Sequence, residues 1–155
     1  MKILKSKTQI ALAAVAVLLI IGAVATGHIP GYMNHSMSRH MQGLMQDVPA
    51  PYAGMKNPLP ATSEVIAKGA ELFTTNCSAC HGAGGKGDGS AGETLSPRPS
   101  DLTHILQAPL ARDGYLFWAV SEGGKRFDTA MPAFNEILNE QARWQIIHYL
   151  RTLEP

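Results

Sequence analysis

The most constraining feature of this chain is the pentapeptide Cys77–His81, which reads CSACH. Two cysteines separated by two residues and followed directly by histidine form the attachment signature of a c-type haem. Each thiol can add to a vinyl group of the porphyrin, and the histidine can ligate the iron. A structural zinc site needs a second ligand pair, but the chain has only 2 cysteines. A thioredoxin-like pair needs a βαβ context, which is absent. We therefore expect one covalently bound haem c, held by Cys77, Cys80 and His81.

Length and charge agree with a small cofactor-dependent domain. The 155 residues have room for one modest domain and an extension, and 13 basic against 12 acidic residues argue against nucleic-acid binding. A domain of roughly 90 residues has a small core of its own, and a buried porphyrin would enlarge it. We expect the chain without haem to be poorly folded.

The N-terminus predicts a membrane segment over residues 1–26. Three lysines precede an apolar run of 16 residues, 10–25, which can be extended to residue 29 and then spans about 30 Å as a helix. The lysines place the N-terminus in the cytoplasm and the haem domain on the periplasmic side of the cytoplasmic membrane. The alternative is a cleavable signal peptide, because Ala23-Val24-Ala25 matches a cleavage site. The protein would then be soluble in the periplasm.

Residues 27–60 form a predicted linker that holds five of the 10 prolines. As a flexible coil this segment would be a tether with a reach of about 30 Å. Methionine recurs at every fourth position in its middle, which favours a short amphipathic helix. Copper binding and plain disorder are the alternatives, because thioether and imidazole groups suit Cu(I). The residues concerned are Met33, Met37, Met41, Met45, His28, His35 and His40.

The haem domain is expected over residues 61–155 and is predicted to be all-α, since no convincing strand pattern appears. Thr62 or Ser63 can cap the first helix, which leads into Cys77. The glycine-rich stretch 82–92 is predicted to be non-helical and free to fold closely along the haem edge. Further helices are predicted after Asp101, from Asp113 to the glycine pair 123–124, and over about 135–153.

Met131 is the predicted second axial ligand. It is the only methionine after the haem motif and stands in the turn Asp128–Pro132, whereas a structural methionine would usually lie on an apolar helix face. His104 and His148 are rival ligands, and an empty sixth position is a further alternative. The metal ligands predicted are thus His81 and Met131.

Taken in order, these motifs resemble those of class I monohaem cytochrome c. The order is the haem motif, the glycine-rich loop, a Pro-x-Pro-x-Asp-Leu segment at 97–102, Met131-Pro132 and a terminal helix, and the resemblance covers about residues 61–155. It implies a steep crossing of the first and last helices, which Gly69, Phe73 and Tyr149 would match. It also implies that a proline carbonyl, of Pro97 or Pro99, accepts the proton of the ligating histidine.

Filled axial positions favour an electron carrier over an enzyme. No substrate can then reach the iron, and thioether ligation raises the reduction potential. The partners would be redox proteins such as a dehydrogenase, an oxidase or a reductase. Residues 61–155 hold 8 basic and 11 acidic residues, which favours docking to a basic patch. The alternatives are a gas sensor or small haem enzyme with an open sixth site, and a copper-handling redox protein that uses the Met/His linker.

Overall fold

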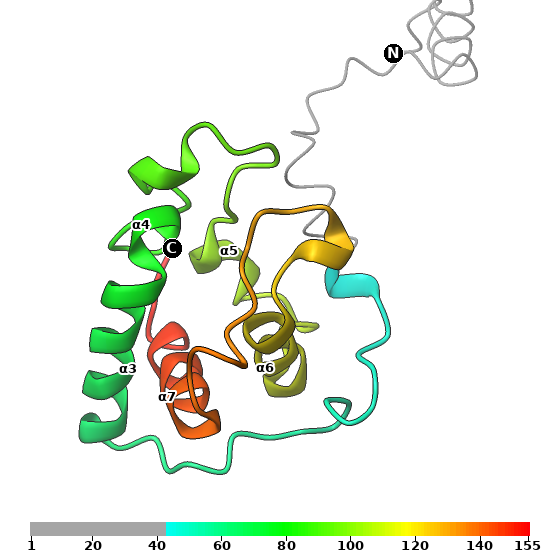
Figure 1. Cartoon of the computed structure of the whole chain (residues 1–155). Helices are drawn as coiled ribbons and strands as arrows, with labels where there is room; N and C mark the ends of the chain where they lie inside the picture. Colours follow the sequence, from blue (N-terminus) through cyan, green and yellow to red (C-terminus); the bar gives the residue numbers. More distant parts are fainter. Residues whose placement is uncertain (1–42) are drawn as a thin grey trace, which may run out of the picture. The chain divides into compact units, whose positions relative to one another are not determined.

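The computed structural model describes residues 43–155, and helices are its regular elements (Figure 1). No strand occurs within this described range, which confirms the predicted all-α fold. In chain order the elements are α3 (Ser63–Asn76), α4 (Ser78–His81), η1 (Ser90–Gly92), α5 (Leu102–Ile105), α6 (Asp113–Glu122), η2 (Lys125–Phe127) and α7 (Glu140–Leu150).

Three helices begin where the sequence predicts. The Thr62 side chain accepts a hydrogen bond from the N–H of Val65 at 3.3 Å and caps α3. Asp101 caps α5 by accepting from the N–H of Thr103 at 3.0 Å. The next helix, α6, starts at Asp113 and ends before Gly123. At α3 and α5 a local side chain satisfies a backbone group that the helix end leaves without a partner, whereas Arg112 before α6 makes no such bond.

The last helix is shorter than predicted. It begins at Glu140 rather than near residue 135, because the Asn139 side chain accepts from the N–H of Ala142 at 2.8 Å and caps it there. The preceding residues form a turn instead, in which the N–H of Leu138 donates to the carbonyl of Phe134 at 2.8 Å.

The first and last helices of the domain cross at close range, as the resemblance implies. In Figure 1, α3 and α7 lie against each other. A Cβ at Gly69 would overlap the backbone carbonyl of Gln145, so glycine is what allows the two backbones to approach. The rings of Phe73 and Tyr149 lie 5.2 Å apart at the same crossing. This contact fixes the end of α3, where the haem motif begins.

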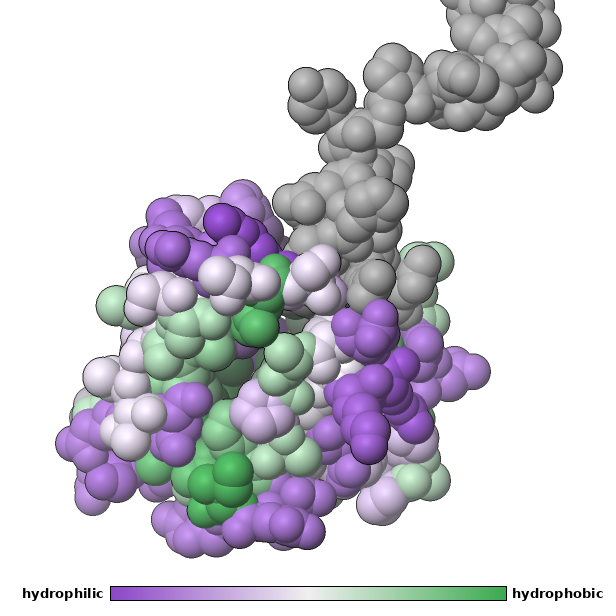
Figure 2. Space-filling view, turned by 45° about the horizontal axis from the view of Figure 1, so that its top comes forward, coloured by the Kyte–Doolittle hydropathy of each residue, from purple (hydrophilic) through white to green (hydrophobic). Residues whose placement is uncertain are grey.

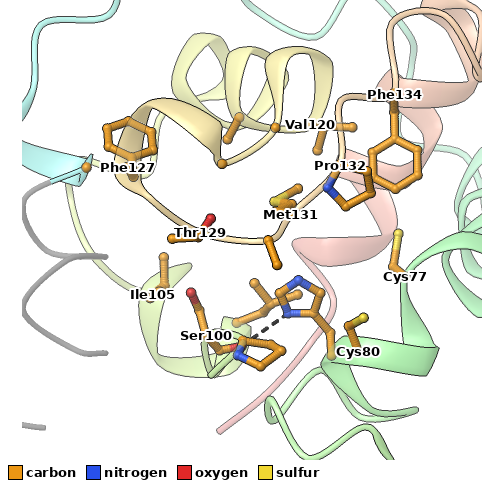
Figure 3. A pocket seen from close by; sticks show the side chains of 18 of the residues that line it. Cys77, Cys80, Ser100, Ile105, Val120, Phe127, Thr129, Met131, Pro132 and Phe134 are labelled. Carbon is orange, nitrogen blue, oxygen red and sulfur yellow. Dashed lines mark hydrogen bonds between the residues drawn. The ribbon is translucent and has the colours of Figure 1, made fainter. Parts of the chain in front are cut away.

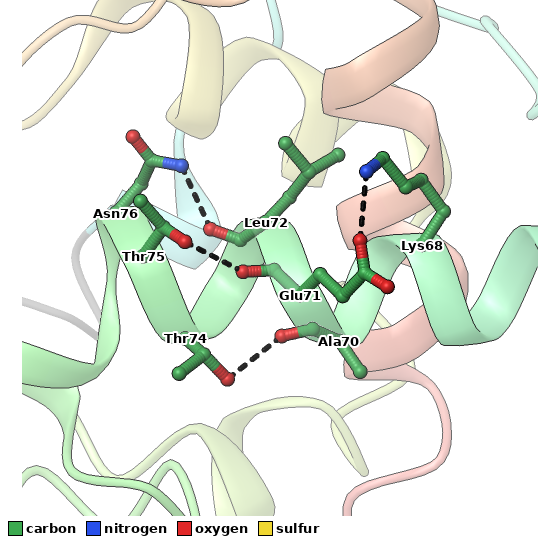
Figure 4. Close-up of polar contacts among 7 residues, drawn as sticks. All are labelled: Lys68, Ala70, Glu71, Leu72, Thr74, Thr75 and Asn76. Carbon is green, nitrogen blue, oxygen red and sulfur yellow. Dashed lines mark hydrogen bonds and ion pairs between the residues drawn. The ribbon is translucent and has the colours of Figure 1, made fainter.

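The C-terminal half of α3 holds its own polar side chains close to its backbone. Thr74, Thr75 and Asn76 each donate to the carbonyl four residues earlier, at 2.9, 3.0 and 2.8 Å (Figure 4). Such bonds satisfy the side chains locally. The helix runs without interruption to Asn76, directly before the haem motif.

Residues 43–60, which we call the strap, pack against the rest of the domain. The sequence predicts that this part of the linker is an extended tether, and that prediction is wrong. Leu44 is only 4% exposed and belongs to the core cluster, and the Tyr52 ring lies 6.2 Å from that of Phe117. The strap has turns at residues 50–54, and its apolar side chains find a surface on which to be buried. In Figure 1 the strap runs around the domain to the start of α3.

The other N-terminal predictions fall on residues that the structure does not describe. These are the membrane segment 1–26 and the part of the Met/His linker before residue 43. Within residues 43–155, no helix is long and apolar enough to cross a membrane. Met45, the last methionine of the predicted series, is 73% exposed.

Candidate cofactor site

The CSACH motif forms a single helical turn, which gathers its three chemical groups. The N–H groups of Cys80 and His81 donate to the carbonyl of Cys77 at 3.2 and 2.9 Å. Residues three and four apart lie on the same face of a helix, so the two thiols and the imidazole come together. All three residues line one cavity, shown in Figure 3.

This cavity has an empty volume of about 1310 Å³, counted out to its open mouth. Because that figure includes open solvent, it is an upper bound, and the space inside that water-sized molecules could occupy is about 200 Å³. Apolar surface gathers around the hollow in Figure 2. Several lining residues also belong to the hydrophobic core, so the cavity lies inside the core and not beside it. They are Phe73, Leu116, Ile146 and Leu150.

The His81 ring is oriented by the backbone of Ser100. Its Nδ1 lies 3.2 Å from the Ser100 carbonyl oxygen, the dashed line in Figure 3. A carbonyl can only accept, so Nδ1 carries the proton and Nε2 keeps its lone pair for a metal. The expected acceptor was the carbonyl of Pro97 or Pro99, and this is corrected to Ser100. The following residue, Asp101, caps α5 and so helps to fix the backbone next to the Ser100 carbonyl.

Burial keeps the side chains of His81 and Cys77 uncharged. It lowers the pKa of His81, although the bond to Ser100 acts in the opposite direction. The imidazole is therefore neutral, the form that binds metals. Burial, with a smaller contribution from neighbouring Cys80, raises the pKa of Cys77 to about 12.

Met131 lines the same cavity and comes from a different wall. It lies in the loop between η2 and α7, whereas the cysteines lie at the ends of α3 and α4. Figure 3 shows Met131 and Pro132 in the cavity together with Cys77 and Cys80. The structure thus brings together all four residues that the sequence singles out.

The two rival histidines do not line the cavity. The His104 side chain is 71% exposed, and its Nε2 lies 3.8 Å from an Asp101 carboxylate oxygen. Nε2 of His148 lies 2.9 Å from the Leu59 carbonyl of the strap. His148 is thus engaged by the strap, and His104 faces solvent.

The glycine-rich loop lies behind the motif and not along the cavity, contrary to expectation. Residues 82–92 are absent from the cavity lining, and the N–H of Gly87 donates to the carbonyl of His81 at 2.8 Å. The lining instead includes Leu95 and residues 97–100. Sequence reasoning overlooked Arg98 here, although it stands in the Pro-x-Pro segment. Among the lining residues that the structure describes, it is the one with a full positive charge.

The donor set fits a c-type haem. Two thiols stand ready for thioether bonds, a neutral imidazole and a thioether can ligate iron, and the cavity walls are apolar. Arg98 supplies a cation that suits the carboxylates of a porphyrin.

Comparison with known proteins agrees with this fit. The family model for cytochrome c matches residues 66–154, more than half of the chain. Among solved structures, a chain of the Kuenenia stuttgartiensis reducing HAO-like protein complex Kustc0457/Kustc0458 is similar, with 26% identity and a TM-score of 0.53. The match covers 71% of this chain and 50% of that chain. None of the curated proteins matches significantly.

Proposed function

Because this chain belongs to the cytochrome c family, whose members carry covalently bound haem c, we propose that it is a monohaem electron carrier with His81 and Met131 as axial ligands. The observation that carries the proposal is that these two side chains, from separate walls, line one apolar cavity with both cysteines. When bound, the haem would supply a one-electron couple between ferrous and ferric iron.

The chain's own residues would set the conditions for this couple. The bond from Nδ1 of His81 to the Ser100 carbonyl fixes the imidazole and raises its basicity as a ligand. A Met131 thioether favours the reduced state, which raises the potential. Buried walls such as Phe73 and Leu116 exclude water.

The electron donor and acceptor are proposed to be redox proteins that meet the domain transiently. Residues 61–155 have a net charge of −3, counted from 8 basic and 11 acidic residues, so a basic partner surface is favoured. The similar solved chain belongs to a protein complex, which supports a protein partner in general terms.

We propose a location at the cytoplasmic membrane, with the haem domain on the periplasmic side. The supporting feature is the lysine-flanked apolar run before residue 26. Intact-mass measurement of the mature protein decides between a retained anchor and a cleaved signal, because cleavage after Ala25 would remove the run.

Carbon monoxide tests the ligation directly. The matured, reduced full-length protein should show a low-spin c-type spectrum that carbon monoxide leaves unchanged, because both axial positions are filled. Met131→Ala should bind carbon monoxide readily and have a lower reduction potential, since the thioether is gone. Rapid binding by the unchanged protein would contradict the proposal and favour a sensor or enzyme with an open sixth site.

A second candidate is a resident electron-transfer subunit of a larger redox assembly. It is favoured by the similar solved structure, which is that of a protein complex. Analytical ultracentrifugation after mild solubilisation separates the two candidates. A carrier sediments as one chain, whereas a subunit sediments in fixed stoichiometry with a redox protein.

A further inference from the structure

The strap contacts the domain at several points along its length. At its end, Asn57 donates from its backbone N–H to Asp113 at 3.1 Å and from its side chain to the Trp144 carbonyl at 2.9 Å. In its middle, the strap backbone crosses α6 at Gly114, where a Cβ would overlap the Tyr52 carbonyl. At its start, Leu44 is buried in the core. The strap is therefore an integral part of the folded domain.

Two of the strap contacts reach the segment that presents Met131. The Tyr52 hydroxyl donates to Glu122 Oε1 at 2.5 Å, and Glu122 is the last residue of α6. This hydrogen bond, together with partial burial, raises the pKa of Tyr52, so the hydroxyl stays protonated and donates. A Cβ placed on Gly43 would lie 3.6 Å from the Phe127 ring, which shows how closely the strap backbone approaches η2.

We call residues 123–131 the ligand loop, and it is closed by its own backbone. The N–H of Gly124 donates to the Met131 carbonyl at 2.9 Å, and the N–H of Thr129 donates to the Gly124 carbonyl at 3.1 Å. The beginning of the loop is thus bonded directly to its end. A displacement at Glu122 or Phe127 would be passed on to Met131.

Phe127 also connects the strap to the cavity wall. Its ring packs edge-on against Trp118 at 5.6 Å, and Trp118 packs against Tyr115 at 6.1 Å. Tyr115 and Phe127 line the cavity, as does Gly43 of the strap. The strap, α6 and the ligand loop therefore meet at one side of the cofactor cavity.

We propose that the strap is a positioning element that holds the ligand loop closed, so that Met131 occupies the sixth position of the iron. Tyr52 and Leu44 are its positioning residues, and neither lines the cavity. Release of the strap would open the loop and withdraw Met131, which would leave a coordination position that a small neutral ligand could fill. This proposal rests on the ligation by Met131 proposed above.

The test compares carbon monoxide binding by full-length, reduced holoprotein with and without the strap contact. Tyr52→Phe keeps the ring on Phe117 but removes the bond to Glu122. One such bond is worth about a factor of ten in an equilibrium constant, so the apparent affinity for carbon monoxide should rise about tenfold. Tyr149→Phe is the matched control, because it removes a hydroxyl at the α3–α7 crossing, and it should leave the affinity unchanged.

A second variant separates positioning from general stability. Leu44→Ala should also raise carbon monoxide binding and weaken the long-wavelength absorption band that methionine gives ferric haem. If both strap variants lower the melting temperature but bind carbon monoxide as the unchanged protein does, the strap is merely structural and the proposal is overturned. If the unchanged protein already binds carbon monoxide readily, ligation by Met131 itself fails, and the strap proposal fails with it.

Discussion

At the scale of single residues, Asp113 joins three parts of the fold. It is the first residue of α6, and it accepts hydrogen bonds from the Asn57 N–H of the strap at 3.1 Å and from Arg151 beyond α7 at 2.9 Å. Partial burial is the largest single influence and acts to raise its pKa. The bonds from Asn57 and Arg151, with the charge of Arg151, outweigh burial together, so the pKa is lowered.

The lowered pKa predicts an acid-dependent contribution of Asp113 to stability. A carboxyl group whose pKa is lower when folded contributes fully above its unfolded value, about 3.9, and this contribution is lost as the pH falls through the folded value. Asp113→Asn should therefore be less stable than the unchanged protein at pH 7, and the difference should shrink at pH 3. The urea midpoints of the Asp113→Asn and the unchanged holoprotein, each at pH 7 and pH 3, measure this difference in stability. A difference that is the same at pH 3 and pH 7 would show that the carboxylate charge plays no part.

At the scale of the elements, the crossing of α3 and α7 holds the haem motif in place. It depends on Gly69, since the neighbouring atom is a backbone carbonyl that cannot swing away as a flexible side chain could. Gly69→Ala should cost about 3 kcal/mol from overpacking, offset by about 1 kcal/mol that alanine gains over glycine in a helix. Chemical denaturation of the holoprotein measures the net loss.

Gly84→Ala is the control for this substitution. An added Cβ there comes no closer than 3.9 Å to the atoms around it, and the site is in a loop. Its effect should be within about 0.5 kcal/mol. Equal effects of the two substitutions would mean that the crossing tolerates a methyl group. Glycine at position 69 would then not be required for the close approach of α3 and α7.

At the scale of the whole molecule, the cofactor cavity and the hydrophobic core share residues. Phe73, Leu116, Ile146 and Leu150 belong to both, so without haem a large part of the core would face an empty cavity. Poorly filled cores lose both transfer free energy and contacts. These shared residues indicate that the domain folds around its cofactor.

We accordingly expect that the chain cannot keep its fold when haem attachment is prevented. A variant with Cys77→Ser and Cys80→Ser should lose cooperative thermal unfolding, followed by far-ultraviolet circular dichroism. Met131→Ala is the comparison, because it retains both thioether bonds and should still unfold cooperatively. A sharp transition at the unchanged temperature in the double cysteine variant would refute the expectation.

The local features of this protein could be predicted because they depend on residues a few positions apart. The CSACH spacing determines which groups share a helical face. The capping side chains of Thr62 and Asp101 accept hydrogen bonds from backbone N–H groups only three and two residues further along the chain. The start of α7 could also have been predicted, because Asn139 before Glu140 is a capping signal. The apolar residues before it led to a predicted start near residue 135 instead.

The remaining features were decided by tertiary structure. The acceptor for His81 is 19 residues away, and the family resemblance implied Pro97 or Pro99 instead of Ser100. The contact between Tyr52 and Glu122 spans 70 residues, and a proline-rich segment has the same composition whether it is free or packed. Burial against a surface built by distant helices made the strap part of the domain. The sequence by itself thus determined the cofactor chemistry, and the packing of distant segments decided how its ligands are held.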